Sequence, residues 1–270
     1  MMMGNTGVLA KLTELSNRLG VPSNDYVILS EGNTSARIDD MTFWIKASGA
    51  SLRSSTERSF VRVAVHDILR LLDCSDLKDD ELRIRLDNAV RPEDGVPPTG
   101  RPSIETLLHA VCLQAADVHY VAHTHPSAVT ALVCSNHFAE LAARPLFPDQ
   151  IVVCGQQPLF IDYADPGREL ALAVNEGLNR HIADHGGPPR AIYLKNHGFV
   201  ALGSTAREVE CITAMAVKAA RILAGTMAFG GPCFMPDRDV HRIAYRSDER
   251  YRRKKILDED VIPFEREQNA

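Results

Sequence analysis

The 270-residue sequence lacks the cysteine spacing of a disulfide-rich scaffold or a thiolate metal site. Its six cysteines are scattered, and no two form a C-x-x-C pair. We expect them to be reduced and mostly buried, because a chain of this length can bury a large apolar core without covalent staples. A small secreted toxin or hormone is therefore excluded.

The sequence also lacks an excess of basic charge and any long apolar run. Thirty Lys+Arg face 35 Asp+Glu, and the formal net charge of −5 gives no attraction to nucleic acid. No uninterrupted apolar stretch reaches about 18 residues, and no basic segment leads into an apolar run at the N-terminus. We therefore expect no nucleic-acid partner, no membrane association and a cytoplasmic location.

The hydrophobic pattern predicts a folded α/β protein. We expect a single layered domain over residues 1–270, in which helices flank a mixed, mostly antiparallel central β-sheet. The predicted strands are 26–30, 34–38, 43–46, 119–124, 151–154, 191–194 and 199–202, and the predicted helices are 8–19, 65–72, 103–116, 127–135, 168–183 and 206–224. A Pro/Gly-rich passage at 91–100 predicts a loop. A charged helical tail over about 240–270 is expected to be solvated or intersubunit.

Two histidines, His123 and His125, end a strand-like apolar run. Side chains at i and i+2 of a strand point to the same side, about 6.6 Å apart, so both imidazoles can converge on one cation. His197 follows a second apolar β-type run, 72 residues after His125. Three imidazoles at strand ends match a catalytic zinc-type site, which keeps a position open for substrate.

A rival pair, His181 and His185, is spaced i,i+4 on a predicted helix. This spacing suits a zinc-binding helix, but the segment lacks the glutamate of a metalloprotease motif. We interpret this pair as exposed and without function.

The segment Pro102-Ser103-Ile104-Glu105 begins a predicted helix. A carboxylate in the first turn is favoured by the helix dipole, so helix capping alone would account for Glu105. His109 lies one turn further and either orients this carboxylate or packs in the core. We assign His109 no catalytic role.

Two short turns near the N-terminus contain Gly32-Asn33 and Ser48-Gly49. Such turns offer backbone N–H groups and hydroxyls to an anion, although either one alone is an ordinary β-turn.

In chain order these segments read G-N-T-S, A-S-G, P-S-x-E, H-T-H and N-H-G. This order resembles the class II aldolase/adducin family, typified by fuculose-phosphate and rhamnulose-phosphate aldolases and ribulose-phosphate 4-epimerase, from about Leu9 to Leu223. The run 43–49 and the tail 242–250 look most like the rhamnulose-phosphate-aldolase-like branch. The resemblance implies a class II aldolase-like fold and assigns roles to nine residues. It implies zinc ligands at His123, His125 and His197, a catalytic carboxylate at Glu105, and substrate-phosphate binding at Gly32, Asn33, Ser48, Gly49 and Ser103.

One departure from the family pattern bears on the substrate. Ile104 stands where the family's usual P-S-S-E has a second serine, so one phosphate-binding hydroxyl is missing. The substrate's phosphorylation therefore stays open. The sequence does not identify counterparts of the family's catalytic tyrosines.

The resemblance implies a metal-dependent carbon–carbon lyase. We expect retro-aldol cleavage of a small sugar or sugar phosphate through a metal-stabilised enediolate, with Glu105 moving the proton. The alternatives are a decarboxylase of a sugar-derived oxo-acid, a dehydratase or 4-epimerase, and a non-enzymatic adducin-like module. The expected cofactor is a divalent metal, zinc first, with manganese or cobalt as alternatives. A homotetramer is implied by the resemblance only.

Overall fold

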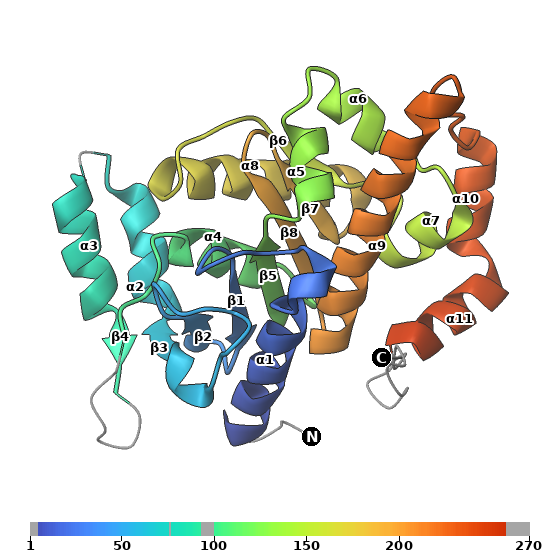
Figure 1. Ribbon diagram of the computed structural model, residues 1–270. Coiled ribbons are helices and arrows are strands. Elements are labelled where there is room, and N and C mark those ends of the chain that lie inside the picture. Colours follow the sequence, from blue (N-terminus) through green and yellow to red (C-terminus); the bar gives the residue numbers. More distant parts are fainter. Residues whose placement is uncertain (1–4, 76, 93–99, 258–270) are drawn as a thin grey trace.

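The computed structural model describes residues 5–75, 77–92 and 100–257 (Figure 1). Within them, eight strands form one sheet in the order β4-β3-β2-β1-β5-β8-β7-β6. Neighbouring strands are antiparallel except for the parallel pair β6 and β7. The strands are β1 Asn33–Arg37, β2 Thr42–Lys46, β3 Phe60–Ala64, β4 Val90–Arg91, β5 Tyr120–Thr124, β6 Leu159–Ile161, β7 Ala191–Leu194 and β8 Gly198–Gly203. The predicted mixed, mostly antiparallel sheet with flanking helices is confirmed.

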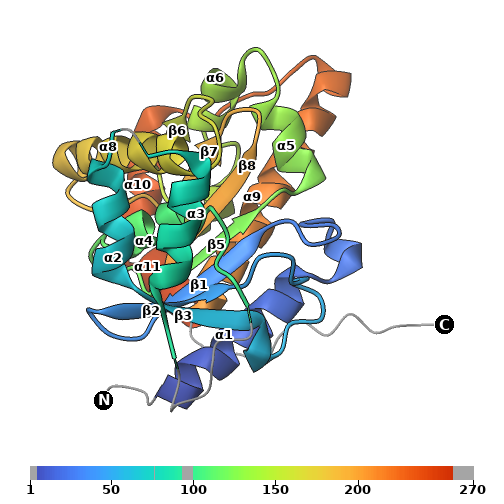
Figure 2. The same ribbon diagram turned by 90° about the vertical axis from the view of Figure 1, so that its left-hand side faces the viewer.

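Helices cover both faces of this sheet (Figures 1 and 2). Apolar side chains of α2, α3, α4 and α8 pack on one face, and those of α1, α5 and α9 pack on the other. A third, small cluster joins α7 to α10. The helices are α1 Asn5–Leu19, α2 Val65–Leu69, α3 Asp79–Asn88, α4 Thr106–Leu113, α5 Ser127–Val133, α6 Phe138–Ala143, α7 Pro148–Cys154, α8 Arg168–His185, α9 Ala206–Thr226, α10 Asp237–Tyr245 and α11 Ser247–Leu257.

Two predicted strands are wrong. Residues 151–154 are the end of helix α7, which begins with Pro148 at its first position and Asp149 in its first turn. Both residues favour a helix start, and they outweigh the strand preference of the β-branched run that follows. Residues 26–30 are irregular because Leu29 has a φ of 52° inside a turn that the Glu31 N–H closes on the Ile28 carbonyl.

Several elements were not predicted, namely strands β3, β4 and β6 and helices α3 and α6. The expected helix over 103–116 is shorter, with bounds Thr106–Leu113. Most of the predicted loop at 91–100 lies outside the described residues, as does 258–270 of the charged tail. The described part of that tail is helical, in α10 and α11.

The cysteines are free, but they are not mostly buried as expected. Cys112 and Cys154 are buried, Cys74 and Cys211 are half-buried, and two more are exposed. Burial raises the pKa of the Cys154 thiol to about 12, so this group stays protonated near neutral pH.

Among the described residues, one helix, Ala206–Phe229, is long and apolar enough to cross a membrane by length and composition. A core helix passes the same test. The buried side chains of α9, including Val209, Ile212 and Val217, lie in the core cluster shared with α1 and the sheet.

Candidate metal centre and its carboxylate

The sheet brings the three predicted ligands together where β5 ends beside the turn between β7 and β8. His123 lies in β5, and His125 follows directly after it. β8 pairs with β5 so that Val200 faces His123, and the turn that precedes β8 carries His197. Asn196 adopts a φ of 53° in this turn, a conformation that asparagine tolerates better than most residues. The antiparallel register therefore places His197 beside the other two histidines.

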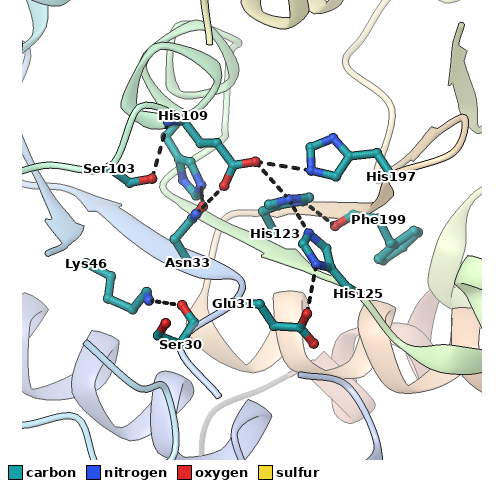
Figure 3. A network of polar contacts seen from close by, with 11 residues as sticks. Ser30, Glu31, Asn33, Lys46, Ser103, His109, His123, His125, His197 and Phe199 are labelled. Carbon is teal, nitrogen blue, oxygen red and sulfur yellow. Dashed lines mark hydrogen bonds and ion pairs between the residues drawn. The ribbon is translucent and has the colours of Figure 1, made fainter. Parts of the chain in front are cut away.

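The three imidazoles form one compact cluster (Figure 3). One ligand nitrogen from each of His123, His125 and His197 lies within 4.8 Å of the others. The ring centroids are 4.6 Å apart for His123 and His125, 4.8 Å for His123 and His197, and 5.2 Å for His125 and His197. This spacing suits three ligands of one ion.

The contacts on the far side of two rings fix which nitrogen faces the cluster. His123 Nδ1 lies 3.1 Å from the Phe199 carbonyl, and His125 Nδ1 lies 3.3 Å from a Glu31 carboxylate oxygen. Both partners only accept, so each Nδ1 carries the hydrogen. The two Nε2 atoms therefore both face the cluster and lie 2.8 Å apart. In the metal-free protein a proton on His123 Nε2 joins them, and a metal ion can take the place of that proton, so the residues fit a metal ion.

Gly198 leaves the space that the rings occupy. A Cβ at this position would lie 2.5 Å from His125 Cδ2 and 2.7 Å from the Thr124 carbonyl oxygen. Both distances are far inside van der Waals contact. Any larger residue would displace the histidines or the end of β5, so the turn after His197 requires glycine.

Glu105 directly precedes helix α4 and faces the cluster. Its Oε1 lies 3.2 Å from both His123 Nε2 and His197 Nε2, and its Oε2 accepts a hydrogen bond of 2.5 Å from Asn33 Nδ2. Burial would raise the pKa of Glu105, but the charge of His123 and the hydrogen bonds of His123, His197 and Asn33 hold it well below its usual range. The carboxylate is therefore ionised near neutral pH.

The pKa values within the cluster differ between the histidines. Burial lowers the pKa of His123, but the charge and hydrogen bond of Glu105 outweigh it and raise the pKa above its usual value. Burial, with the charges of His123 and His197, lowers the pKa of His125 to about 4. His125 is therefore neutral near pH 7, as a ligand must be.

The residues expected to bind substrate lie in segments that contact one another. Asn33 pairs with His123 across β1 and β5, and Ser103 Oγ accepts the Glu105 N–H at 3.3 Å. The Ser48 N–H donates to the Arg101 carbonyl at 2.7 Å, next to an isolated bridge between residues 47 and 102. Gly32 has a φ of 69°, and a Cβ there would lie 2.8 Å from the His123 carbonyl oxygen.

Lys46 joins two of these turns and was not predicted to belong to the site. Its Nζ donates to the Ser30 carbonyl at 3.0 Å and to the Ala50 carbonyl at 2.5 Å. The side chain is buried, and burial lowers its pKa to about 8 in spite of the opposing charge of Glu105. A lysine inside the apolar run 43–47 was the signal that could have identified it.

Glu31, Ser35 and His109 also contact site residues and were not assigned to the site. Glu31 accepts from His125, and His109 contacts both Ser35 and Asn33. The rival histidine pair lies on α8, away from the cluster of three. His181 is buried rather than exposed as expected, and its ring centroid lies 4.5 Å from that of His185.

A family profile, the class II aldolase and adducin N-terminal domain, matches residues 10–224. The match covers well over half of the chain. This chain belongs to the class II aldolase/adducin family. The membership agrees with the order of motifs in the sequence.

Curated relatives of this family member are distant. An uncharacterized oxidoreductase, YuxG, from Bacillus subtilis (strain 168) is 28% identical over 184 residues, which are 64% of this chain and 23% of the relative. The chain therefore spans about a quarter of that relative. Methylthioribulose-1-phosphate dehydratase from Geobacillus kaustophilus (strain HTA426) is 25% identical over 222 residues, which are 75% of this chain and 86% of the relative.

Solved structures support the same fold. A structure of L-fuculose 1-phosphate aldolase superposes with a TM-score of 0.64 at 21% identity, covering 90% of this chain and 97% of that one. This likeness establishes the class II aldolase fold.

Proposed function

We propose that this class II aldolase family member is a metal-dependent carbon–carbon lyase that cleaves a small sugar or sugar phosphate by retro-aldol chemistry. His123, His125 and His197 would hold a divalent cation, zinc first and manganese or cobalt as alternatives. Glu105 would be the catalytic base.

The observation that carries this proposal is the convergence of three histidine ligand nitrogens and one carboxylate. Nε2 of His123 and His125 face each other at 2.8 Å, and Glu105 Oε1 lies 3.2 Å from His123 Nε2. When bound, a divalent cation would supply Lewis acidity toward a carbonyl oxygen and its neighbouring hydroxyl. A base held beside such a site suits the removal of a proton next to a carbonyl.

Each residue of the proposed site then has a separate role. The ionised Glu105 takes the proton from a substrate hydroxyl or carbon, and Asn33 holds the second carboxylate oxygen so that the first one faces the reacting atoms. Gly32, Ser48, Gly49 and Ser103 would bind the polar end of the substrate through backbone N–H groups and hydroxyls. Asn33, which was expected in the same set, faces Glu105 instead.

The charge of that polar end stays open in this proposal. Lys46 is a buried cation beside the turn of Ser48 and Gly49, which favours an acidic group. Ile104, in contrast, brings no hydroxyl, and its side chain packs toward Gly167 and the core. Phosphorylated and unphosphorylated substrates therefore both belong in the assay.

The test is a product assay on ketoses, ketose phosphates and sugar-derived oxo-acids. Lyase activity requires two fragments whose carbon atoms add up to those of the substrate. We expect the Glu105→Gln variant to lose about 100-fold or more in turnover while it retains bound metal. Full turnover in this variant would contradict the assigned base.

A dehydratase is the second candidate, because the methylthioribulose-1-phosphate dehydratase similar to this chain covers three quarters of it. Dehydration begins with the same proton removal but expels water instead of breaking a carbon–carbon bond. Its product keeps every carbon atom and loses the mass of one water. Mass spectrometry of the products separates it from the lyase, and release of carbon dioxide would identify a decarboxylase.

Assembly and location remain predictions. We infer a homotetramer and a cytoplasmic location from the family resemblance and from the sequence. The solution mass of the purified chain tests the first, and fractionation of the source cells tests the second.

A further inference from the structure

A network of buried hydrogen bonds extends from Ser35 on β1 through His109 on α4 to Glu105, the proposed catalytic base. Figure 3 shows its part from His109 to Asn33. Asn33 and Ser35 lie two positions apart on β1, so their side chains share a face of the sheet. His109, on α4, contacts both. Its Nδ1 lies 2.6 Å from Ser35 Oγ, its Nε2 contacts Asn33 Oδ1, and Asn33 Nδ2 donates to Glu105 Oε2 at 2.5 Å.

The direction of every hydrogen bond in this network follows from the orientation of the Asn33 amide. Asn33 Nδ2 lies against Glu105 Oε2 and can only donate, so the Asn33 carbonyl oxygen faces His109. That oxygen only accepts, so His109 must carry its hydrogen on Nε2. A neutral His109 then has a bare Nδ1, which accepts the hydroxyl hydrogen of Ser35.

His109 is neutral in this environment. It is fully buried, and burial, with the charges of His123 and Lys46, lowers its pKa to about 3 against the opposing charge of Glu105. Every residue of α4 is buried. His109 is the one residue of this helix whose side chain can take a positive charge. A residue needed only to fill this space would be expected to be apolar.

We propose that Ser35, His109 and Asn33 form a one-way hydrogen-bond relay that holds the Glu105 carboxylate toward the metal centre. Ser35 and His109 are positioning residues, since neither contacts the ligand histidines, and they act by preventing the Asn33 amide from turning over. A reversed amide would point its oxygen at Glu105 and repel the carboxylate. The relay deepens the proposed function and rests on it for the role of Glu105.

The relay makes a direct prediction about one proton. With ¹⁵N-labelled histidine, long-range ¹H–¹⁵N spectra of the metal-free protein should show His109 protonated on Nε2 and bare on Nδ1, from pH 5 to pH 8. The signal is assigned by its loss in His109→Gln. A hydrogen on Nδ1, or a doubly protonated ring in this range, would overturn the relay.

The second test compares two substitutions of His109. A glutamine amide can still donate to Asn33 Oδ1, whereas leucine cannot. The readout is deuterium exchange at carbon in dihydroxyacetone and in dihydroxyacetone phosphate, with zinc bound. We expect His109→Leu to lower the maximal exchange rate about 10- to 100-fold with KM within about twofold. His109→Gln should retain about a third or more of the rate.

Ser16→Ala is the matched control. Ser16 Oγ makes a buried hydrogen bond of 2.6 Å to Thr34, the residue between the two relay positions on β1, but it takes no part in the relay. Its exchange rate should stay within twofold of the wild type, and that of Ser35→Ala should fall about 3-fold or more. Equal rates in His109→Leu and His109→Gln would overturn the relay.

Failure of the proposed function would look different. If the wild-type chain binds no metal and exchanges neither probe, the lyase proposal fails. The tautomer of His109 still decides the relay, because that measurement needs neither metal nor substrate.

Discussion

At the residue scale, the contacts behind the ligand rings decide what the site can bind. The Phe199 carbonyl and the Glu31 carboxylate accept the two Nδ1 hydrogens, so both Nε2 atoms face inward. A carboxylate behind a ligand histidine also increases its basicity and fixes its orientation. Glu31 also stabilises its own loop, because its other carboxylate oxygen accepts the Ile28 N–H at 2.7 Å.

Glu31→Gln should therefore weaken metal binding. We expect an approximately 10-fold loss of zinc affinity. The substitution removes the negative charge beside His125, and an amide has only one oxygen to accept from both the Ile28 N–H and His125 Nδ1. Competition with a zinc-sensitive chelator dye measures the affinity. The control is Glu140→Gln, since Glu140 pairs with an exposed histidine, His137, at 3.7 Å on the surface. Equal affinities in both variants would show that Glu31 does not act on the metal centre.

Much of this site was predictable from residue order, and the reason is physical. The ligands His123, His125 and His197 lie at the ends of apolar strand-like runs, so their position at strand ends can be inferred from the local pattern. The relay partners Ser35 and His109 lie 74 positions apart. Their contact depends on how α4 packs on β1, which no local pattern encodes.

At the scale of the element, the turn from β7 into β8 controls the spacing of the ligands. Gly198 opens β8 directly after His197, and the rings of His123 and His125 lie against it. The turn thus supplies one ligand and the space for the other two.

Gly198→Ala should lower metal affinity by about 10-fold or more and destabilise the fold by about 1–3 kcal/mol, because the added methyl group overlaps the His125 ring. Chelator competition and urea unfolding measure the two effects. Gly225→Ala in α9 is the control, since a Cβ there meets nothing within 4 Å. Metal affinity of Gly198→Ala equal to that of the control would contradict this role of the turn.

Elements were predicted well where apolar periodicity was long and poorly where helix-start residues competed with a β-branched run. Helix α8 was predicted over 168–183 and spans Arg168–His185. Helix α7 was missed because residues 151–153 are β-branched, although Pro148 and Asp149 before them favour a helix start. Its buried residues pack against α9 and α10, and this tertiary packing outweighs local propensity.

At the scale of the whole molecule, the burial of His109 makes the free energy of unfolding depend on pH. Unfolded His109 takes up a proton as the pH falls below about 6.5, whereas the folded residue stays neutral down to about 3. The unfolded state therefore binds more protons between these values, and this contribution destabilises the folded state as the pH falls. Within this range, the free energy of unfolding falls by about 1.4 kcal/mol for each unit by which the pH falls.

The His109→Gln variant lacks this contribution. Between pH 5.5 and pH 4.5, the metal-free wild type should lose about 1.4 kcal/mol more unfolding free energy than the variant does. Urea unfolding at both pH values measures the difference. Parallel loss in the two proteins would mean that folded His109 takes up its proton in the ordinary range.

The central claim is that three histidines from two separate parts of the sheet bind one divalent cation. Its most direct test is the metal content of the purified chain, measured by elemental analysis after loading with zinc and dialysis. We predict one zinc per chain in the wild type and less than about a tenth of that in His123→Ala, because two imidazoles cannot hold the ion under dialysis. No bound zinc in the wild type, or full occupancy in His123→Ala, would contradict the account.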